Sequence, residues 1–254
     1  MSKTTNARRN EIYKMVLSVG EVKVKELANH FEVSTETIRK DLNFMDETGM
    51  VLKTHGGAKI LNDYYELPVD VKLQEYVQEK RCIARKALDL IDDNSVIFLD
   101  AGSTTIQVAR MLRLKQGLTV VTNSLVVADL AMESGHHVIC TGGSAQRRGR
   151  CFVGYYALNV IDSIHFDTII TGSDGFLGMS GPTTFSLDEV DVRRHLLANS
   201  DRKVLIADAS KFTRTSTYQF ARFEEYDYFI TNESDEVDRS VVAGVKNVVI
   251  VKGE

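Results

Sequence analysis

The chain has 254 residues, of which 43% are hydrophobic and 26% are charged, and it contains only 2 prolines. This length favours one large domain or two unequal domains, and the composition excludes disordered, collagen-like and low-complexity chains. No apolar run approaches the roughly 18 residues that a membrane-spanning helix needs, and the N-terminus lacks the apolar stretch of a signal peptide. We therefore expect a cytoplasmic protein with no membrane partner.

The charge is unevenly distributed along the chain. The net charge is −4, yet residues 1–60 carry 10 Lys and Arg against 8 Asp and Glu, whereas residues 61–254 carry 21 against 27. An acidic C-terminal part behind a mildly basic N-terminal part indicates that a polyanionic partner would bind the N-terminal part.

The cysteines indicate neither a disulfide framework nor a metal site. Cys82, Cys140 and Cys151 are odd in number and lack the paired spacing that disulfides or zinc require. We expect reduced thiols, no metal site and no cofactor.

The first fifty residues contain three helical patterns. Apolar residues recur at helical spacing over residues 12–19 and 24–31, and a third pattern, with Ile38, Leu42 and Met45, follows Ser34. Serine is a preferred N-cap residue. Two helices separated by a few residues, the second beginning after a capping serine, are typical of a helix-turn-helix.

The third helix has the surface of a recognition helix. Thr35, Thr37, Arg39 and Lys40 lie on its exposed N-terminal half, while its apolar residues face a core. Hydroxyl groups bind phosphate oxygens, and an arginine paired with guanine contributes roughly 1–3 kcal/mol of discrimination. Asp41 is acidic, so we expect it to form an intramolecular ion pair or to interact with the helix dipole.

A hairpin is predicted after this helix. Residues 50–61 read as two short strands around Gly56-Gly57, which we expect to supply the positive φ values of a tight turn. Lys53, His55 and Lys59 would lie on this hairpin, as on the wing of a winged helix. A small helical domain that does not bind DNA remains the alternative, since periodicity alone does not demonstrate DNA binding.

Residues 33–58 resemble the helix-turn-helix signature of the DeoR family of bacterial transcription regulators. Residues 37–39, 41, 42, 49 and 55–58 match that signature in order. The resemblance implies a winged helix-turn-helix domain over residues 1–60 that binds double-stranded operator DNA. We expect the DNA contacts to come from Ser34, Thr35, Thr37, Arg39, Lys40, Lys53, His55 and Lys59.

Residues 76–254 have the pattern of an α/β domain, behind a predicted linker at residues 61–75. Strand-like segments rich in Val and Ile alternate with helix-length segments, which favours a mainly parallel sheet covered on both faces, as in Rossmann-like folds. The predicted strands are residues 96–99, 118–122, 137–140, 167–172, 203–208, 228–231 and 247–251.

Polar clusters follow five of these strands, where ligands bind in parallel sheets. The pattern suits a small polyhydroxylated anion. Its phosphate would be held at a turn before a helix beginning near Ile106, its hydroxyls by aspartates, and its charge by a lysine. The expected contacts are Asp100, Gly102, Ser103, Thr104, Thr105, Asn123, Asp174 and Lys211. The basic run 147–150 could contribute, or could be a solvated loop.

This part of the chain is similar to the sensor domain of DeoR-family proteins, notably over residues 79–91, 99–112 and 206–212. That domain resembles ribose-5-phosphate isomerase in fold, and its relatives sense phosphorylated sugars. Two departures stand out. Asp174-Gly175 is followed by residues 176–178, Phe-Leu-Gly, where the isomerases carry a second Asp and a Glu. Lys72 stands where the family often has Arg, so a bidentate pair is lost.

The sequence therefore predicts a repressor of a sugar-catabolic operon, relieved by a phosphorylated sugar and at least dimeric. The alternative is a sugar-phosphate isomerase with an appended DNA-binding domain, with Asp174 as base and Lys211 as electrophile. The missing carboxylates argue against proton abstraction, so we predict that the protein is not an enzyme.

Overall fold

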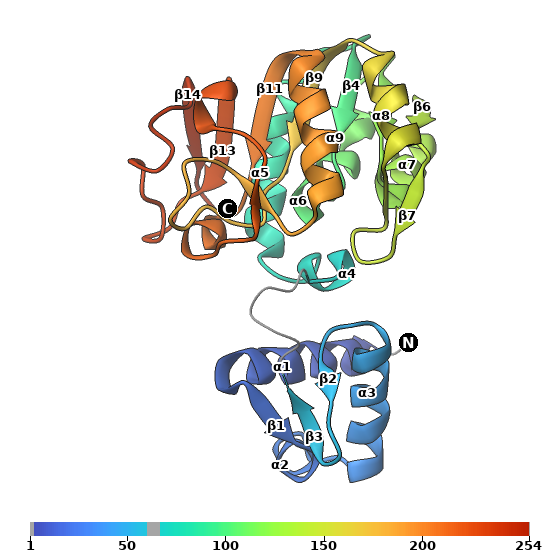
Figure 1. Cartoon of the computed structure of the whole chain (residues 1–254), viewed down its shortest axis with the longest axis vertical. Coiled ribbons are helices and arrows are strands. Elements are labelled where there is room, and N and C mark those ends of the chain that lie inside the picture. Colours follow the sequence, from blue (N-terminus) through green and yellow to red (C-terminus); the bar gives the residue numbers. More distant parts are fainter. Residues whose placement is uncertain (1–2, 60–66, 254) are drawn as a thin grey trace. The chain divides into compact units, whose positions relative to one another are not determined.

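The computed structural model describes residues 3–59 and 67–253. The chain divides into two compact units, the N-terminal unit ending at Val71 and the C-terminal unit beginning at Lys72 (Figure 1). The predicted linker, residues 61–75, spans this division, and its residues 61–66 lie outside the described part. Within the described ranges, no helix is both long and apolar enough to cross a membrane.

The described residues of the N-terminal unit form a winged helix-turn-helix, as predicted. Its helices pack around fully buried apolar residues that include Ile12, Leu27, Ile38 and Leu42. A three-stranded antiparallel sheet of order β1-β3-β2 completes the unit. The elements are α1 (Lys3–Val19), β1 (Glu21–Lys23), α2 (Val24–His30), α3 (Thr35–Glu47), β2 (Leu52–Lys53) and β3 (Gly57–Lys59).

The sheet corrects the prediction for the glycine pair. Strand β1 was not predicted, and it pairs with β3 so that Val22 lies opposite Ala58. Neither Gly56 nor Gly57 has a positive φ. Gly57 is needed for space instead, because a Cβ there would overlap the backbone carbonyl of Val22, whereas a Cβ at Gly56 would meet nothing.

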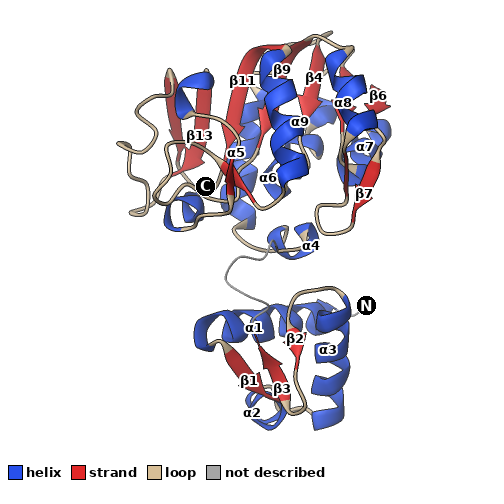
Figure 2. Cartoon of the chain, in the orientation of Figure 1, coloured by secondary structure: helices blue, strands red, loops and turns tan. Residues whose placement is uncertain are grey.

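The C-terminal unit contains the predicted parallel sheet, and all the predicted strands belong to it. The strand order is β14-β13-β11-β9-β4-β5-β6 and every neighbouring pair is parallel. Helices cover both faces, with α5, α6 and α7 on one side and α8 and α9 on the other (Figure 2). The strands are β4 (Val96–Leu99), β5 (Thr119–Thr122), β6 (His137–Cys140), β9 (Phe166–Thr171), β11 (Ser200–Ile206), β13 (Tyr228–Asn232) and β14 (Asn247–Val251).

The remaining elements connect or flank this sheet. Helix α6 begins at Ser103 and not near Ile106, so Ser103, Thr104 and Thr105 form its first turn. The others are α4 (Val69–Lys72), α5 (Val77–Leu88), α6 (Ser103–Ala109), η1 (Leu112–Leu114), α7 (Leu125–Glu133), β7 (Ser144–Gln146), β8 (Cys151–Val153), α8 (Tyr155–Asp162), β10 (Thr183–Thr184), α9 (Leu187–Ala198), η2 (Ala209–Thr213), β12 (Tyr218–Gln219) and η3 (Phe223–Glu225).

The strand order reverses between β4 and β9. From β4 the chain proceeds to β5 and β6 on one side, and then returns to β9, β11, β13 and β14 on the other. Such a switch point opens a crevice at the carboxyl ends of the two central strands. Asp100 follows β4 and Asp174 follows β9 by a few residues, so both lie at this edge.

Candidate functional site

The N-terminal half of α3 presents polar and basic side chains to solvent. Ser34 caps the helix, since its Oγ accepts a hydrogen bond from the Thr37 amide at 3.1 Å. Arg39 is exposed, and among the described residues it makes only long contacts, to Glu36 at 3.7 Å and to Thr35 Oγ1 at 3.5 Å. Lys40 is also exposed. The Arg39 guanidinium is therefore accessible, whereas the Ser34 hydroxyl is occupied in the cap.

Asp41 forms the intramolecular ion pairs that its charge predicted. Its side chain is buried, and its two carboxylate oxygens accept hydrogen bonds from Arg8 Nε at 2.7 Å and Arg9 Nε at 2.8 Å. The Arg9 guanidinium also lies over the Phe44 ring. These contacts attach α1 to α3 and fix the orientation of α3.

The hairpin β2–β3 packs beside α3. Lys53 Nζ donates to Asn43 Oδ1 at 2.6 Å, and the Lys53 amide donates to Asp46 Oδ1 at 2.8 Å. His55 and Lys59 are exposed. The residues predicted to contact DNA thus lie on α3 and on the hairpin attached to it.

Asp100, after β4, is held by a buried arginine. Asp100 Oδ2 accepts a hydrogen bond from Arg193 Nε at 2.9 Å, and Arg193 also donates to Glu189 Oε2 at 2.8 Å. Thr184 donates to the same glutamate oxygen at 2.7 Å. Burial disfavours a charged Arg193, but Asp100 and Glu189 outweigh this effect and raise its pKa. This network fixes the direction of the Asp100 carboxylate.

The turn at Gly102 uses one of its three hydroxyls internally. Thr105 Oγ1 accepts from the Gly102 amide at 2.9 Å and donates to the Asp100 carbonyl at 2.6 Å. Ser103 and Thr104 are buried, and among the described residues their hydroxyls have no hydrogen-bond partner. Of the predicted phosphate contacts, these two keep hydroxyls that a ligand could use.

Asp174, after β9, is paired with the first residue of the C-terminal unit. Lys72 Nζ donates to Asp174 Oδ1 at 2.7 Å, and both side chains are largely buried. Burial alone would raise the pKa of Asp174, but Lys72, with help from Arg193 and Lys211, lowers it. Asp174 is therefore ionised, and it lies in the same charge network as Asp100.

Two lysines surround the fully buried Asp208, after β11. Lys80 Nζ lies 3.9 Å from Asp208 Oδ2 and donates to the carbonyls of Lys72 at 2.6 Å and Glu75 at 2.8 Å. Burial lowers the pKa of Lys80 to about 8. Burial also lowers the pKa of Lys211, against the opposing effect of Asp208.

Asn123, after β5, offers an acceptor at the same edge of the sheet. Its Nδ2 donates to the Phe152 carbonyl at 3.2 Å, while its buried Oδ1 has no hydrogen-bond partner among the described residues. The basic run 147–150 forms the turn between β7 and β8. The structure thus brings the ends of β4, β9, β11 and β5 to one edge.

Three charged residues of this network were missed in the sequence. Arg193 and Glu189 lie on the buried face of α9, and Lys80 lies on the buried face of α5. The signal was present, since Lys80 stands three and four residues before Ile83 and Ala84. A charged side chain on an apolar helix face is almost never fully buried unless it is paired.

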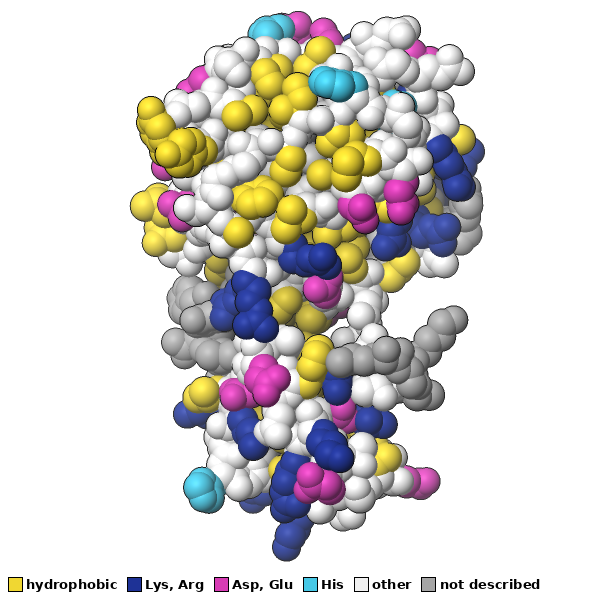
Figure 3. Space-filling model, turned by 90° about the vertical axis from the view of Figure 1, so that its right-hand side faces the viewer, with side chains coloured by type: hydrophobic (Ala, Val, Ile, Leu, Met, Phe, Trp, Pro, Cys, Tyr) yellow, Lys and Arg dark blue, Asp and Glu magenta, His cyan; other side chains and the backbone are white. Residues whose placement is uncertain are grey.

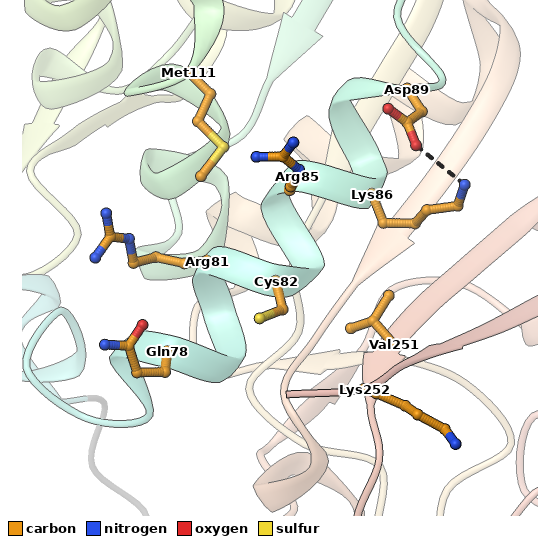
Figure 4. A pocket seen from close by; sticks show the side chains of 9 residues that line it. All are labelled: Gln78, Arg81, Cys82, Arg85, Lys86, Asp89, Met111, Val251 and Lys252. Atoms are coloured by element: carbon orange, nitrogen blue, oxygen red, sulfur yellow. Dashed lines mark hydrogen bonds and ion pairs between the residues drawn. The ribbon is translucent and has the colours of Figure 1, made fainter. Parts of the chain in front are cut away.

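A separate pocket lies on the outward side of α5 (Figure 4). It has a volume of about 440 Å³ and none of the predicted effector residues lines it. Its lining includes Arg81, Arg85, Lys86 and Lys252. The residues predicted to bind the effector follow the carboxyl ends of the strands, and none of them borders this pocket.

Comparisons with known proteins cover both units. Residues 8–63 match the DeoR-like helix-turn-helix domain, and residues 75–233 match the DeoR C terminal sensor domain. The chain is 31% identical to the putative aga operon transcriptional repressor of Escherichia coli O157:H7, over 98% of this chain and 95% of that protein.

It is 32% identical to the glycerol-3-phosphate regulon repressor of Escherichia coli K12, over 89% of this chain and 90% of that protein. Among solved structures, ribose 5-phosphate isomerase A of Methanocaldococcus jannaschii is 18% identical over 52% of each chain, with a TM-score of 0.38.

Proposed function

The chain belongs to the DeoR family of DNA-binding transcription regulators, and from this premise we propose that it represses a sugar-catabolic operon and is released from DNA by a phosphorylated sugar. The proposal of an effector site rests on the position of Asp100 and Asp174 at the switch point of the sheet. Arg193 pairs with Asp100, and Lys72 pairs with Asp174. The names of the relatives, repressors of the aga operon and of the glycerol-3-phosphate regulon, support the same proposal.

In the DNA-binding half, α3 enters the major groove and the hairpin follows the adjacent backbone. Arg39 and Lys40 are the exposed cations of α3, so we assign base or phosphate contacts to them. Thr35 and Thr37 contribute hydroxyls to phosphates, while Ser34 acts through the helix cap. Lys53, His55 and Lys59 provide contacts from the hairpin.

In the effector half, the ligand binds across the ends of β4 and β9. Ser103 and Thr104 hydroxyls, with the backbone of Gly102, accommodate a phosphate, and Lys211 supplies a positive charge. Asp100, Asp174 and Asn123 accept hydrogen bonds from sugar hydroxyls. The oriented carboxylate of Asp100 and the unpaired Oδ1 of Asn123 support these roles.

We also propose a cytoplasmic homo-oligomer, because the N-terminal units of two subunits must bind the two half-sites of one operator. Figure 3 shows the side of the C-terminal unit that carries β6 and α7, where hydrophobic side chains are exposed. Tyr155 and Tyr156 are 74% and 71% exposed, and Met132 is 59% exposed. Large apolar side chains that are exposed in this way are typical of an interface when they lie together. The half-sites would lie about 34–36 Å apart, or a multiple of that distance.

The packing of Phe176 argues against an isomerase. Where the isomerases carry further carboxylates, Phe176 is fully buried and packs edge-to-face against Phe212, Phe223 and Phe229. Phe176 therefore contributes to the core and supplies no carboxylate. Turnover of ribose 5-phosphate that Asp174→Ala abolishes would revive the enzymatic alternative.

The DNA-binding assignment is tested by Arg39→Ala. Loss of an exposed cation that reads a base should weaken operator binding by about 1–3 kcal/mol while leaving ligand binding unchanged. Lys14→Ala is the matched control, since Lys14 is an exposed cation on α1. Fluorescence anisotropy with labelled operator measures both. Equal affinity of Arg39→Ala and the wild type would contradict the recognition-helix assignment.

The effector assignment is tested by a thermal-shift screen of pentose, hexose and hexitol phosphates beside their unphosphorylated parents. A ligand at about 100 times its dissociation constant stabilises the folded state by about 2.7 kcal/mol. Lys211→Ala should reduce the shift and leave DNA binding intact. A shift that is equal with and without the phosphate group would remove the phosphate from the proposal.

A further inference from the structure

Lys72 joins the entry of the chain to the effector site. It is the first residue of the C-terminal unit and the last residue of α4, so the chain coming from the DNA-binding unit enters the effector unit there. Its ammonium pairs with Asp174, 102 residues further along the chain. One ion pair therefore attaches this entry point to a carboxylate of the proposed site.

A second set of contacts, made by Lys80, attaches the same segment to α5. Lys80 on α5 donates to the carbonyls of Lys72 and Glu75, and its side chain is only 2% exposed. The Lys72 and Asp174 side chains are more accessible, at 15% and 11%. A ligand at the ends of β4 and β9 can therefore reach the Lys72–Asp174 pair, whereas the Lys80 contacts lie inside the unit.

We propose that the Lys72–Asp174 ion pair couples the effector site to the DNA-binding unit, and that an anionic ligand releases the junction segment, residues 67–76, by taking the Lys72 ammonium from Asp174. The inference rests on the proposed effector site. A phosphate dianion competes well with a carboxylate for a lysine because it carries more charge and more acceptor oxygens. Asp174 is then free to accept hydrogen bonds from ligand hydroxyls.

Lys72 is in this sense a positioning residue. Without ligand its side chain and its carbonyl are both attached to the C-terminal unit, so the junction segment has few conformations. With ligand the Lys72 side chain follows the phosphate, while the segment keeps the Lys80 contacts and the 3.8 Å ion pair between Glu75 and Arg214. The ligand-free and ligand-bound states therefore differ in how many conformations the junction segment can adopt. Coupling between two sites requires a free-energy difference of this kind between the two states.

The test is hydrogen exchange of the junction segment in the full chain, with inorganic phosphate as the probe. In the wild type, millimolar phosphate should speed exchange of the junction amides, while chloride at matched ionic strength should not. Lys72→Met and Asp174→Asn should each speed this exchange about tenfold without phosphate, because local opening becomes easier. Phosphate should then have no further effect.

Two control variants separate the pair from general damage. Lys72→Arg keeps the charge and should keep wild-type protection. Lys246→Met breaks the 2.6 Å ion pair between Lys246 and Asp227. Asp227 precedes β13 and Lys246 precedes β14, so the pair lies at the amino ends of these strands, opposite the effector site. This variant should leave hydrogen exchange of the junction unchanged. Wild-type exchange that is indifferent to phosphate, or Lys72→Met exchange equal to the wild type, overturns the inference.

The exchange measurement uses no DNA, so the inference about the junction can be contradicted while the proposed function stands, and the reverse also holds. A wild type that binds an operator but has a phosphate-insensitive junction contradicts only the inference. A wild type with a phosphate-sensitive junction that binds no operator and responds to no sugar phosphate contradicts the proposed function.

Discussion

Lys80 is a cation whose side chain is almost fully buried. Its ammonium is satisfied by two backbone carbonyls and lies beside the fully buried Asp208, yet burial still lowers its pKa to about 8 from 10.5. The unfolded chain therefore binds more protons than the folded protein between these two values. The free energy of unfolding accordingly rises with pH across this window, as far as Lys80 determines it.

This effect can be isolated with Lys80→Met. From about pH 7.5 to about pH 9.5, the free energy of unfolding of the wild type should rise by about 2 kcal/mol relative to the variant. Urea denaturation of both proteins at the two pH values measures the difference. A difference that is constant with pH would mean that Lys80 titrates alike in the folded and unfolded chains.

At the scale of elements, the wing depends on the close approach of β1 and β3. Gly57 and Val22 lie so near that a Cβ at residue 57 would overlap the Val22 carbonyl. Because the obstacle is backbone and not a flexible side chain, β1 or β3 would have to move. The hairpin is also attached to α3 through Lys53, so this movement would reach the DNA-binding surface.

Gly57→Ala should therefore destabilise the N-terminal unit by about 2 kcal/mol or more and weaken operator binding. Gly56→Ala is the matched control, because a Cβ there meets nothing within 4 Å and the backbone has no positive φ. Its effect should stay within about 0.5 kcal/mol. Urea unfolding and operator anisotropy measure both variants. Equal behaviour of the two alanine variants would show that β1 and β3 do not pack this closely.

At the scale of the whole molecule, a regulator with a DNA site and an effector site must show reciprocal coupling. If the sugar phosphate lowers operator affinity by a factor, operator must lower sugar-phosphate affinity by the same factor, about 5–150-fold in typical cases. Operator titrations with and without ligand, and ligand titrations with and without operator, give the two factors. Unequal factors would indicate a further linked equilibrium, such as a change of oligomeric state.

Much of the architecture followed from the sequence because hydrophobic periodicity is a local property. The third helix with its capping Ser34 and all the strands of the parallel sheet were predicted within a few residues of their observed bounds. Strand β1 was missed, because Glu21–Lys23 is too short to show an alternating pattern. The beginning of α6 was misplaced, since Ser103 and Thr104 are polar residues inside a helix turn.

The sequence by itself determined which polar residues follow which strands, and hence that Asp100 and Asp174 lie at a sheet edge. Only the tertiary structure decided their partners. Arg193 reaches Asp100 across 93 residues, and Lys72 reaches Asp174 across 102. Such pairings depend on which strands become neighbours and which helix covers them. That order is set by the packing of the whole sheet and by the cost of burying an unpaired charge, and no local pattern encodes it.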